Sequence, residues 1–215
     1  MITEGKYVSY LSTIDIFGVI ILRGVCEGIL VCDVVLQTLT VWHSMRQKKI
    51  CMLGSFGVGK TSLVARFVHS RYSEKYQTTI GVKIDRKRVS IDGNDLSMLL
   101  WDLHGDDEYQ RVRPSYLRGM SGYFLVIDGT RAETVDVAEE LHSMAEATVG
   151  DVPFIALINK SDLADEWDIA EDRVDRLVAD GWTVHKTSAK TGRLVNESFE
   201  MLAKRILAAD ASPDE

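Results

Sequence analysis

A glycine-rich segment constrains the fold of this chain more than any other feature. It reads Gly54-Ser55-Phe56-Gly57-Val58-Gly59-Lys60-Thr61 and fits the pattern G-x-x-x-x-G-K-[ST]. The segment follows the apolar run Ile50–Leu53 and precedes a stretch with helical periodicity, Lys60–His69. Glycines without Cβ atoms let backbone N–H groups point inward, and the helix N-terminus adds partial positive charge. The segment therefore predicts a phosphate-binding loop between a strand and a helix.

The end of this loop predicts a triphosphate bound together with Mg²⁺. Lys60 supplies a point charge for the β- and γ-phosphates, and Thr61 presents a hydroxyl to the metal. The residues of the loop expected to bind nucleotide are Gly54, Phe56, Gly57, Val58, Gly59, Lys60, Thr61 and Ser62. The loop alone specifies neither the base nor the reaction.

Short apolar runs alternate with helical patterns from residue 48 onward, which predicts an α/β domain with a largely parallel sheet. The predicted strands are Ile50–Leu53, Val82–Ile91, Leu96–Trp101, Tyr123–Ile127, Phe154–Ile158 and Thr183–Lys186. The predicted helices are Lys60–His69, Glu133–Thr148, Ile169–Ala179 and Val195–Ala209. Asp92-Gly93-Asn94 is a turn short enough to join two strands as an antiparallel hairpin. We expect six strands with one antiparallel pair at an edge, and helices on both faces.

Composition excludes several classes of protein. The chain has 215 residues, of which 46% are hydrophobic and 27% charged, values typical of a globular protein. A net charge of −7 argues against a protein that wraps nucleic acid. Cys26, Cys32 and Cys51 match no metal-ligand spacing, so neither a zinc site nor a disulfide framework is expected, and a reducing cytoplasm is the default.

Membrane attachment is not expected from the sequence. The most apolar stretch, Ile14 to Trp42, is interrupted by charged residues and resembles neither a membrane span nor a signal peptide. The end of the chain, Leu207 to Glu215, lacks the cysteine that prenylation requires, so no lipid anchor is expected.

The base is indicated by Asn159-Lys160-Ser161-Asp162, which follows a predicted strand. Ligands bind at the carboxyl ends of strands in open α/β sheets, and a carboxylate there can accept hydrogen bonds from N1 and the 2-amino group of guanine. Adenine offers no such pair of donors. Asp162 would also suit a helix N-cap, but after a phosphate loop the pattern favours guanine.

Residues 48–208 resemble a small GTPase of the Ras superfamily, and more narrowly its Rab-type branch. The resemblance rests on motifs in family order: the phosphate loop, Thr78-Thr79-Ile80-Gly81, Trp101-Asp102-Leu103-His104-Gly105, the Asn159–Asp162 motif and Thr187-Ser188-Ala189-Lys190-Thr191-Gly192. The family has a P-loop NTPase (Ras-like) fold. The absence of a lipidation cysteine is compatible with a bacterial or archaeal relative.

The resemblance implies a role for each matching residue. Thr79, which lies 18 positions after Thr61, would be the second hydroxyl on Mg²⁺, and Asp102 would hold the metal through water. The Gly105 N–H would meet the γ-phosphate. Ser188, Ala189 and Lys190 would support guanine, Tyr72 would pack on the base or ribose, and Tyr76 would lie near the γ-phosphate, although either tyrosine could be an exposed loop aromatic. Lys60, Thr79, Gly105 and Asp106 would surround the reacting phosphate.

Rab-type proteins also read effectors through an aromatic triad, whose positions hold Ile84, Trp101 and Tyr116 here. The first position is normally phenylalanine, so the patch is altered. Trp101 and Tyr116 could instead simply pack the sheet edge.

Three departures from the family pattern bear on hydrolysis. Asp106 occupies the position of the glutamine that orients the attacking water, and an ionised carboxylate there would repel the γ-phosphate. Phe56 stands where the family has a small residue and would crowd an incoming arginine finger. His104 could position water, but a packing role is the favoured interpretation.

Two functions follow. The first is a GTP/GDP switch with slow intrinsic hydrolysis, in which Mg²⁺ and GTP order residues 72–82 and 102–118. The second is a hydrolysis-deficient scaffold that stays loaded with GTP and binds partners. Both would recognise effectors and regulators through the switch regions.

The chain divides near Met45. We expect residues 45–209 to form the nucleotide-binding domain and residues 210–215 an acidic tail. Residues 1–44 lack a clean period. They are either an over-extended reading frame or an appended element that packs on the domain or binds a partner.

Overall fold

The computed structural model describes residues 46–73, 79, 81–105 and 112–211. Its strands are β1 (Arg46–Leu53), β2 (Val82–Ile91), β3 (Asn94–Leu103), β4 (Gly122–Asp128), β5 (Phe154–Asn159) and β6 (Val184–Lys186). Its helices are α2 (Lys60–His69), α3 (Glu133–Val149), α4 (Glu171–Ala179) and α5 (Val195–Ala211), with short 3₁₀ turns at Pro114–Tyr116 and Ala164–Glu166. Each predicted strand and helix is present.

Several element boundaries differ from the prediction: β1 by four residues, and β3, α4 and the end of α5 by two. β1 begins at Arg46 rather than Ile50, because its exposed first half pairs with β3 although it lacks apolar side chains. α4 begins at Glu171 rather than Ile169, because Ala170 has extended backbone angles and Ile169 is buried before the helix starts. Apolar periodicity therefore located the buried parts of these elements and missed their ends.

The strands form one sheet in the order β2-β3-β1-β4-β5-β6. Only β2 and β3 pair antiparallel, across the turn at Asp92 and Gly93, and the other pairs are parallel. The parallel strands place the carboxyl ends of β1, β3, β4 and β5 at one edge of the sheet. This arrangement confirms the predicted six-stranded α/β fold with an antiparallel hairpin at one edge.

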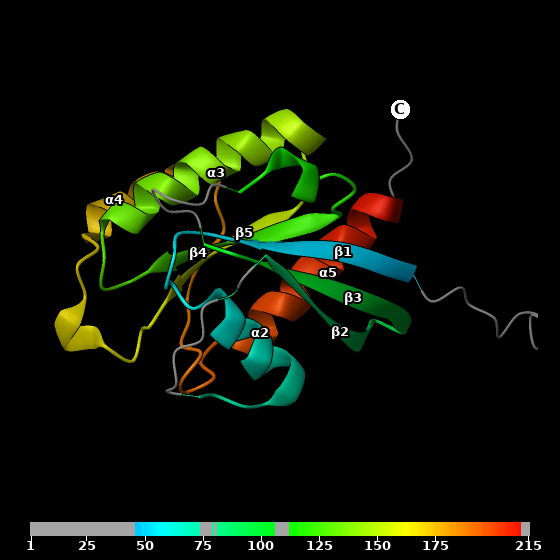
Figure 1. The fold of residues 1–215 in the computed structure, drawn as a ribbon, viewed down its shortest axis with the longest axis horizontal. Helices are drawn as coiled ribbons and strands as arrows, with labels where there is room; N and C mark the ends of the chain where they lie inside the picture. Colours follow the sequence, from blue (N-terminus) through cyan, green and yellow to red (C-terminus); the bar gives the residue numbers. More distant parts are fainter. Residues whose placement is uncertain (1–45, 74–78, 80, 106–111, 212–215) are drawn as a thin grey trace, which may run out of the picture. The chain divides into compact units, whose positions relative to one another are not determined.

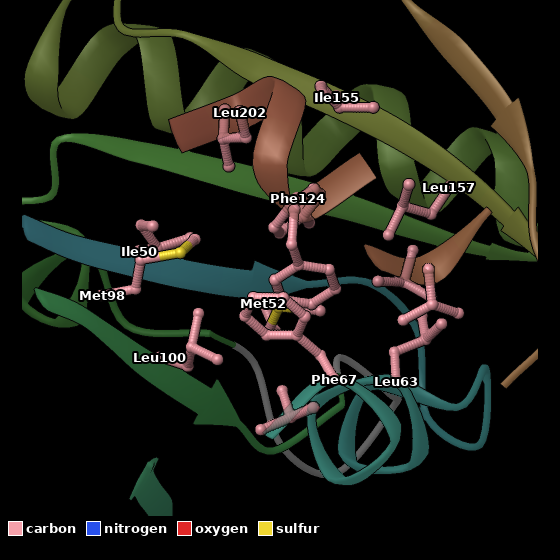
Figure 2. Close-up of a cluster of buried hydrophobic side chains, with 14 of the residues drawn as sticks. Ile50, Met52, Leu63, Phe67, Met98, Leu100, Phe124, Ile155, Leu157 and Leu202 are labelled. Atoms are coloured by element: carbon pink, nitrogen blue, oxygen red, sulfur yellow. The ribbon is translucent and has the colours of Figure 1, made fainter. Parts of the chain in front are cut away.

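Helices cover both faces of the sheet (Figure 1). α3 and α4 lie on one face, and α2 and α5 on the other. The core under α2 and α5 joins strand residues such as Met52 and Phe124 to Phe67 of α2 (Figure 2). The Phe67 ring stacks on that of Phe199 of α5, with ring centroids 4.1 Å apart. Phe199, Leu202 and Ile206 of α5 are buried. No helix in the described part of the chain is long and apolar enough to cross a membrane.

Candidate functional site

The phosphate loop lies at the carboxyl end of β1 and runs directly into α2. Gly54, Gly57 and Gly59 have φ values of 145°, 75° and 100°, in the region that favours glycine. A Cβ at Gly54 would lie 2.2 Å from the Val126 carbonyl oxygen, and one at Gly59 would lie 2.4 Å from Asn159 Nδ2. Close packing against β4 and β5 therefore requires glycine at both positions.

Lys60 is buried at the base of this loop. Its Nζ donates to the carbonyl oxygens of Gly54 and Ser55, at 2.9 and 3.0 Å. The loop thus folds around the ammonium group of its own lysine. A positive charge held within a ring of backbone groups suits a bound polyphosphate.

Three oxygen-bearing side chains converge beside the loop. Thr61 Oγ1 donates to Asp102 Oδ2 at 2.6 Å and lies 2.8 Å from Thr79 Oγ1, which itself is 3.3 Å from the same carboxylate oxygen. Burial raises the pKa of Asp102, although hydrogen bonds from the two threonines and the charge of Lys60 oppose that rise. Asp102 Oδ1 is buried without a hydrogen-bond partner among the described residues. Hydroxyl and carboxylate oxygens with one buried acceptor left over fit a Mg²⁺ ion.

Gly105 packs directly on the phosphate loop. A Cβ at this position would lie 2.3 Å from Phe56 Cα, so only glycine allows the approach. Phe56 itself is 39% exposed. Asp106 and Tyr76, both expected near the γ-phosphate, fall outside the described residues.

The base-binding motif follows β5. Asn159 is buried and donates to the Val58 carbonyl oxygen at 3.0 Å, while its Oδ1 accepts the Ala189 N–H at 3.1 Å. Its amide thus joins the phosphate loop to the Ser188–Lys190 segment. Asp162 is exposed and accepts a hydrogen bond from Ser188 Oγ. It caps none of the described helices, so the N-cap alternative is not supported.

Sequence reasoning missed two contributors to this region. Arg66 of α2 donates to the carbonyl oxygens of Ala189 and Lys190. These hydrogen bonds hold the Ser188–Lys190 segment against α2. Asp128, at the end of β4, accepts a hydrogen bond from Lys160 Nζ at 2.6 Å. Asp128 could have been predicted, because it is an acidic residue that directly follows the predicted strand Tyr123–Ile127. No feature of the sequence indicated a role for Arg66.

Comparison with known proteins agrees with this geometry. A sequence model of the Ras family matches residues 49–208, which is most of the chain. The chain belongs to the Ras family. Among its curated relatives, Ras-related protein Rab-10 of Caenorhabditis elegans is 33% identical over 162 residues, covering 74% of this chain and 81% of the relative. Ras-related protein Rab-7b of Bos taurus is 33% identical over 170 residues, covering 74% and 82%, and Ras-related protein Rab-8B of Homo sapiens is 30% identical over 161 residues, covering 74% and 78%.

This membership confirms the predicted Rab-like small GTPase, with the GTP binding and GTP hydrolysis that define such proteins. The described parts of the chain contain no cluster of His, Cys, Asp or Glu side chains that would form a different metal centre.

The three residues expected to contact effectors are Ile84 on β2, Trp101 on β3 and Tyr116 in the 3₁₀ turn Pro114–Tyr116. Ile84 is 52% exposed, while Trp101 and Tyr116 are half-buried and pack against the core under α3. Lys49 Nζ lies 4.0 Å from the centroid of the Trp101 ring, a cation–π distance. His104 makes an edge-to-face contact with Tyr116, with ring centroids 6.5 Å apart, which supports its packing role. Of the three positions, Ile84 offers the most accessible apolar surface.

Proposed function

We propose that this Rab-like protein is a GTP/GDP switch whose own hydrolysis of GTP is slow. The observation that carries the proposal is the convergence of Thr61, Thr79 and Asp102 beside a loop that folds around Lys60. Thr79 belongs to the segment that would order around GTP. The Thr79 hydroxyl contacts Thr61 on α2 and Asp102 on β3, and these contacts anchor the segment to the sheet and the helix. The protein would act in the cytoplasm.

The nucleotide would lie along the carboxyl edge of the sheet. Backbone N–H groups of residues 57–62 and Lys60 would hold the phosphates, with Gly105 donating its N–H to the γ-phosphate. Mg²⁺ bound by Thr61, Thr79 and Asp102 would neutralise charge on the phosphates. Asp162, Ser188, Ala189 and Lys190 would read guanine, with Asn159 and Lys160 supporting them and Tyr72 and Tyr76 closing the site.

Slow hydrolysis is inferred from two side chains beside the reacting phosphate. Asp106 directly follows Gly105 and offers a negative charge where the family uses a neutral amide. Phe56, which is exposed in the phosphate loop, would obstruct an arginine finger supplied by an activating protein. Both features also suit the alternative, a scaffold that stays loaded with GTP.

Partners would be proteins that distinguish the GTP-bound from the GDP-bound form. The exposed Ile84, next to the half-buried Trp101 and Tyr116, provides apolar surface adjacent to both segments that would respond to nucleotide. An effector would bind there through apolar contact.

Single-turnover hydrolysis separates the two functions. The full chain is loaded with γ-labelled GTP and Mg²⁺, and phosphate release is followed with and without extract from the source cell. Slow release that extract accelerates supports the switch. Negligible release in both conditions supports the scaffold, and failure to bind GTP would refute both.

A further inference from the structure

Asp128 is the meeting point of two cationic side chains beside the nucleotide site. Its side chain is fully buried at the carboxyl end of β4. Oδ2 accepts hydrogen bonds from Lys160 Nζ at 2.6 Å and Arg131 Nε at 2.9 Å, while Oδ1 accepts from the Thr130 N–H and hydroxyl. Burial alone would raise the pKa of Asp128, but the hydrogen bonds from Lys160, Thr130 and Arg131 outweigh it and hold the pKa below its ordinary value.

Arg131 has a second contact, which reaches the phosphate loop. Its Nη2 donates to the Phe56 carbonyl oxygen at 2.8 Å, a contact between residues 75 positions apart in the chain. One guanidinium group therefore bridges a buried carboxylate and a loop carbonyl. The planar, forked shape of guanidinium suits such a bridge, whereas a lysine ammonium acts as a single point charge.

The backbone around Arg131 is itself held in place. The Arg131 N–H donates to the Asp128 carbonyl oxygen at 3.0 Å, and Thr134 Oγ1 donates to the Arg131 carbonyl oxygen at 2.7 Å. The next residue, Ala132, donates its N–H to Oδ2 of Asp168 at 3.1 Å. Asp168 lies in the loop that follows the base motif. The bridge thus starts from a turn fixed on both sides.

The contact with Arg131 involves the carbonyl of the Phe56–Gly57 peptide group. The described chain contains no cis peptide bond, so the C=O of Phe56 and the N–H of Gly57 point in opposite directions. Because the Phe56 carbonyl points toward Arg131, the Gly57 N–H points away from Arg131. Inward N–H groups are what a phosphate-binding loop requires.

We propose that Arg131 is a positioning residue that holds the Phe56–Gly57 peptide in its phosphate-binding orientation and links it through Asp128 to Lys160 of the base motif. The proposal rests on the proposed nucleotide site. Arg131 acts through the loop, so its loss weakens binding of the phosphates and leaves discrimination between bases unchanged.

The test measures dissociation of GDP and of inosine diphosphate, which lacks the 2-amino group, from the full chain with Mg²⁺. We expect Arg131→Ala to accelerate release of both nucleotides about tenfold and to leave the ratio of the two rates unchanged. Arg131→Lys should also release both several-fold faster, because one ammonium group cannot contact the Asp128 carboxylate and the Phe56 carbonyl together. The matched control is Arg176→Ala, which removes an exposed Arg176–Asp172 pair on α4 and should change neither rate.

Either of two further results would contradict the proposal. Full rescue by Arg131→Lys would show that Arg131 only neutralises Asp128, and an altered ratio would show that it acts on the base motif. If circular dichroism shows that Arg131→Ala does not fold, the release rates of Arg131→Lys alone test the proposal. If the wild-type chain and the Arg131 variants release GDP at the same rate, only this proposal is overturned. If the wild-type chain binds no GDP, the proposed function is overturned as well.

Discussion

At the scale of single residues, selectivity for guanine is expected to depend on Asp162. Its carboxylate is exposed at the carboxyl edge of the sheet and is oriented by Ser188 Oγ. Asp162→Asn should lower GTP affinity by roughly 2–4 kcal/mol, because it replaces hydrogen bonds to a charged acceptor. The same variant should gain affinity for xanthine nucleotides, which present an acceptor where guanine has a donor.

Calorimetric titration with GTP and xanthosine triphosphate measures both effects. Asp165→Asn is the matched control, since Asp165 is exposed in the adjacent 3₁₀ turn. Unchanged GTP affinity in Asp162→Asn would contradict the assignment of guanine.

Also at this scale, Asp106 is expected to slow hydrolysis. Two unit charges some 4 Å apart in a partly solvated site repel by about 1 kcal/mol or more. Asp106→Gln removes this repulsion and supplies an amide, so the single-turnover rate should rise by roughly three- to thirtyfold. Phe56→Gly is the companion variant and should change the intrinsic rate little, since it clears space only for an external group. Loss of turnover in Asp106→Gln would instead identify Asp106 as catalytic.

At the scale of elements, β6 and α5 are joined by His185, whose Nδ1 lies 2.7 Å from Ser198 Oγ. Burial lowers the pKa of His185, and the nearby charge of Arg205 adds to the effect. The unfolded chain therefore binds a proton at a pH where the folded chain does not. The stability contributed by the neutral imidazole is present above its ordinary pKa of about 6.5 and is lost as the pH falls below it.

Urea unfolding at about pH 7.5 and about pH 5.5 tests this coupling. The wild-type chain should lose more stability on acidification than His185→Gln, which cannot take up the proton. His69→Gln serves as the control, because His69 is exposed at the end of α2. Equal losses in the wild-type chain and His185→Gln would contradict the assignment.

At the scale of the whole molecule, the described sheet, its two cores and the Ras family match all lie after Met45. We therefore expect a chain of residues 45–215 to bind GDP as tightly as the full chain and to unfold at a similar temperature. If residues 1–44 are an over-extended reading frame, intact mass of the native protein should place its start near Met45. Native protein that includes residues 1–44, or loss of stability on truncation, would instead support an appended element.

The order of strands and helices along the chain, the phosphate loop and the base motif could all be predicted from the sequence. These depend on local properties: apolar periodicity marks the buried side of each element, and glycine at Gly54 and Gly59 permits backbone angles that other residues avoid. The assignment of Thr79 and Asp102 to the metal came from family resemblance, and the structure brings both to Thr61.

The contacts that join the parts of the site could not be predicted from the sequence. Arg131 donates to the Phe56 carbonyl and Arg66 to the Ala189 carbonyl. Asp128 accepts hydrogen bonds from both Lys160 and Arg131. Except for Arg131 and Asp128, the residues of each pair are far from each other in the sequence. No apolar periodicity relates them. They form because parallel strands bring their carboxyl ends to one edge of the sheet, where a buried carboxylate must find cationic partners to offset its desolvation.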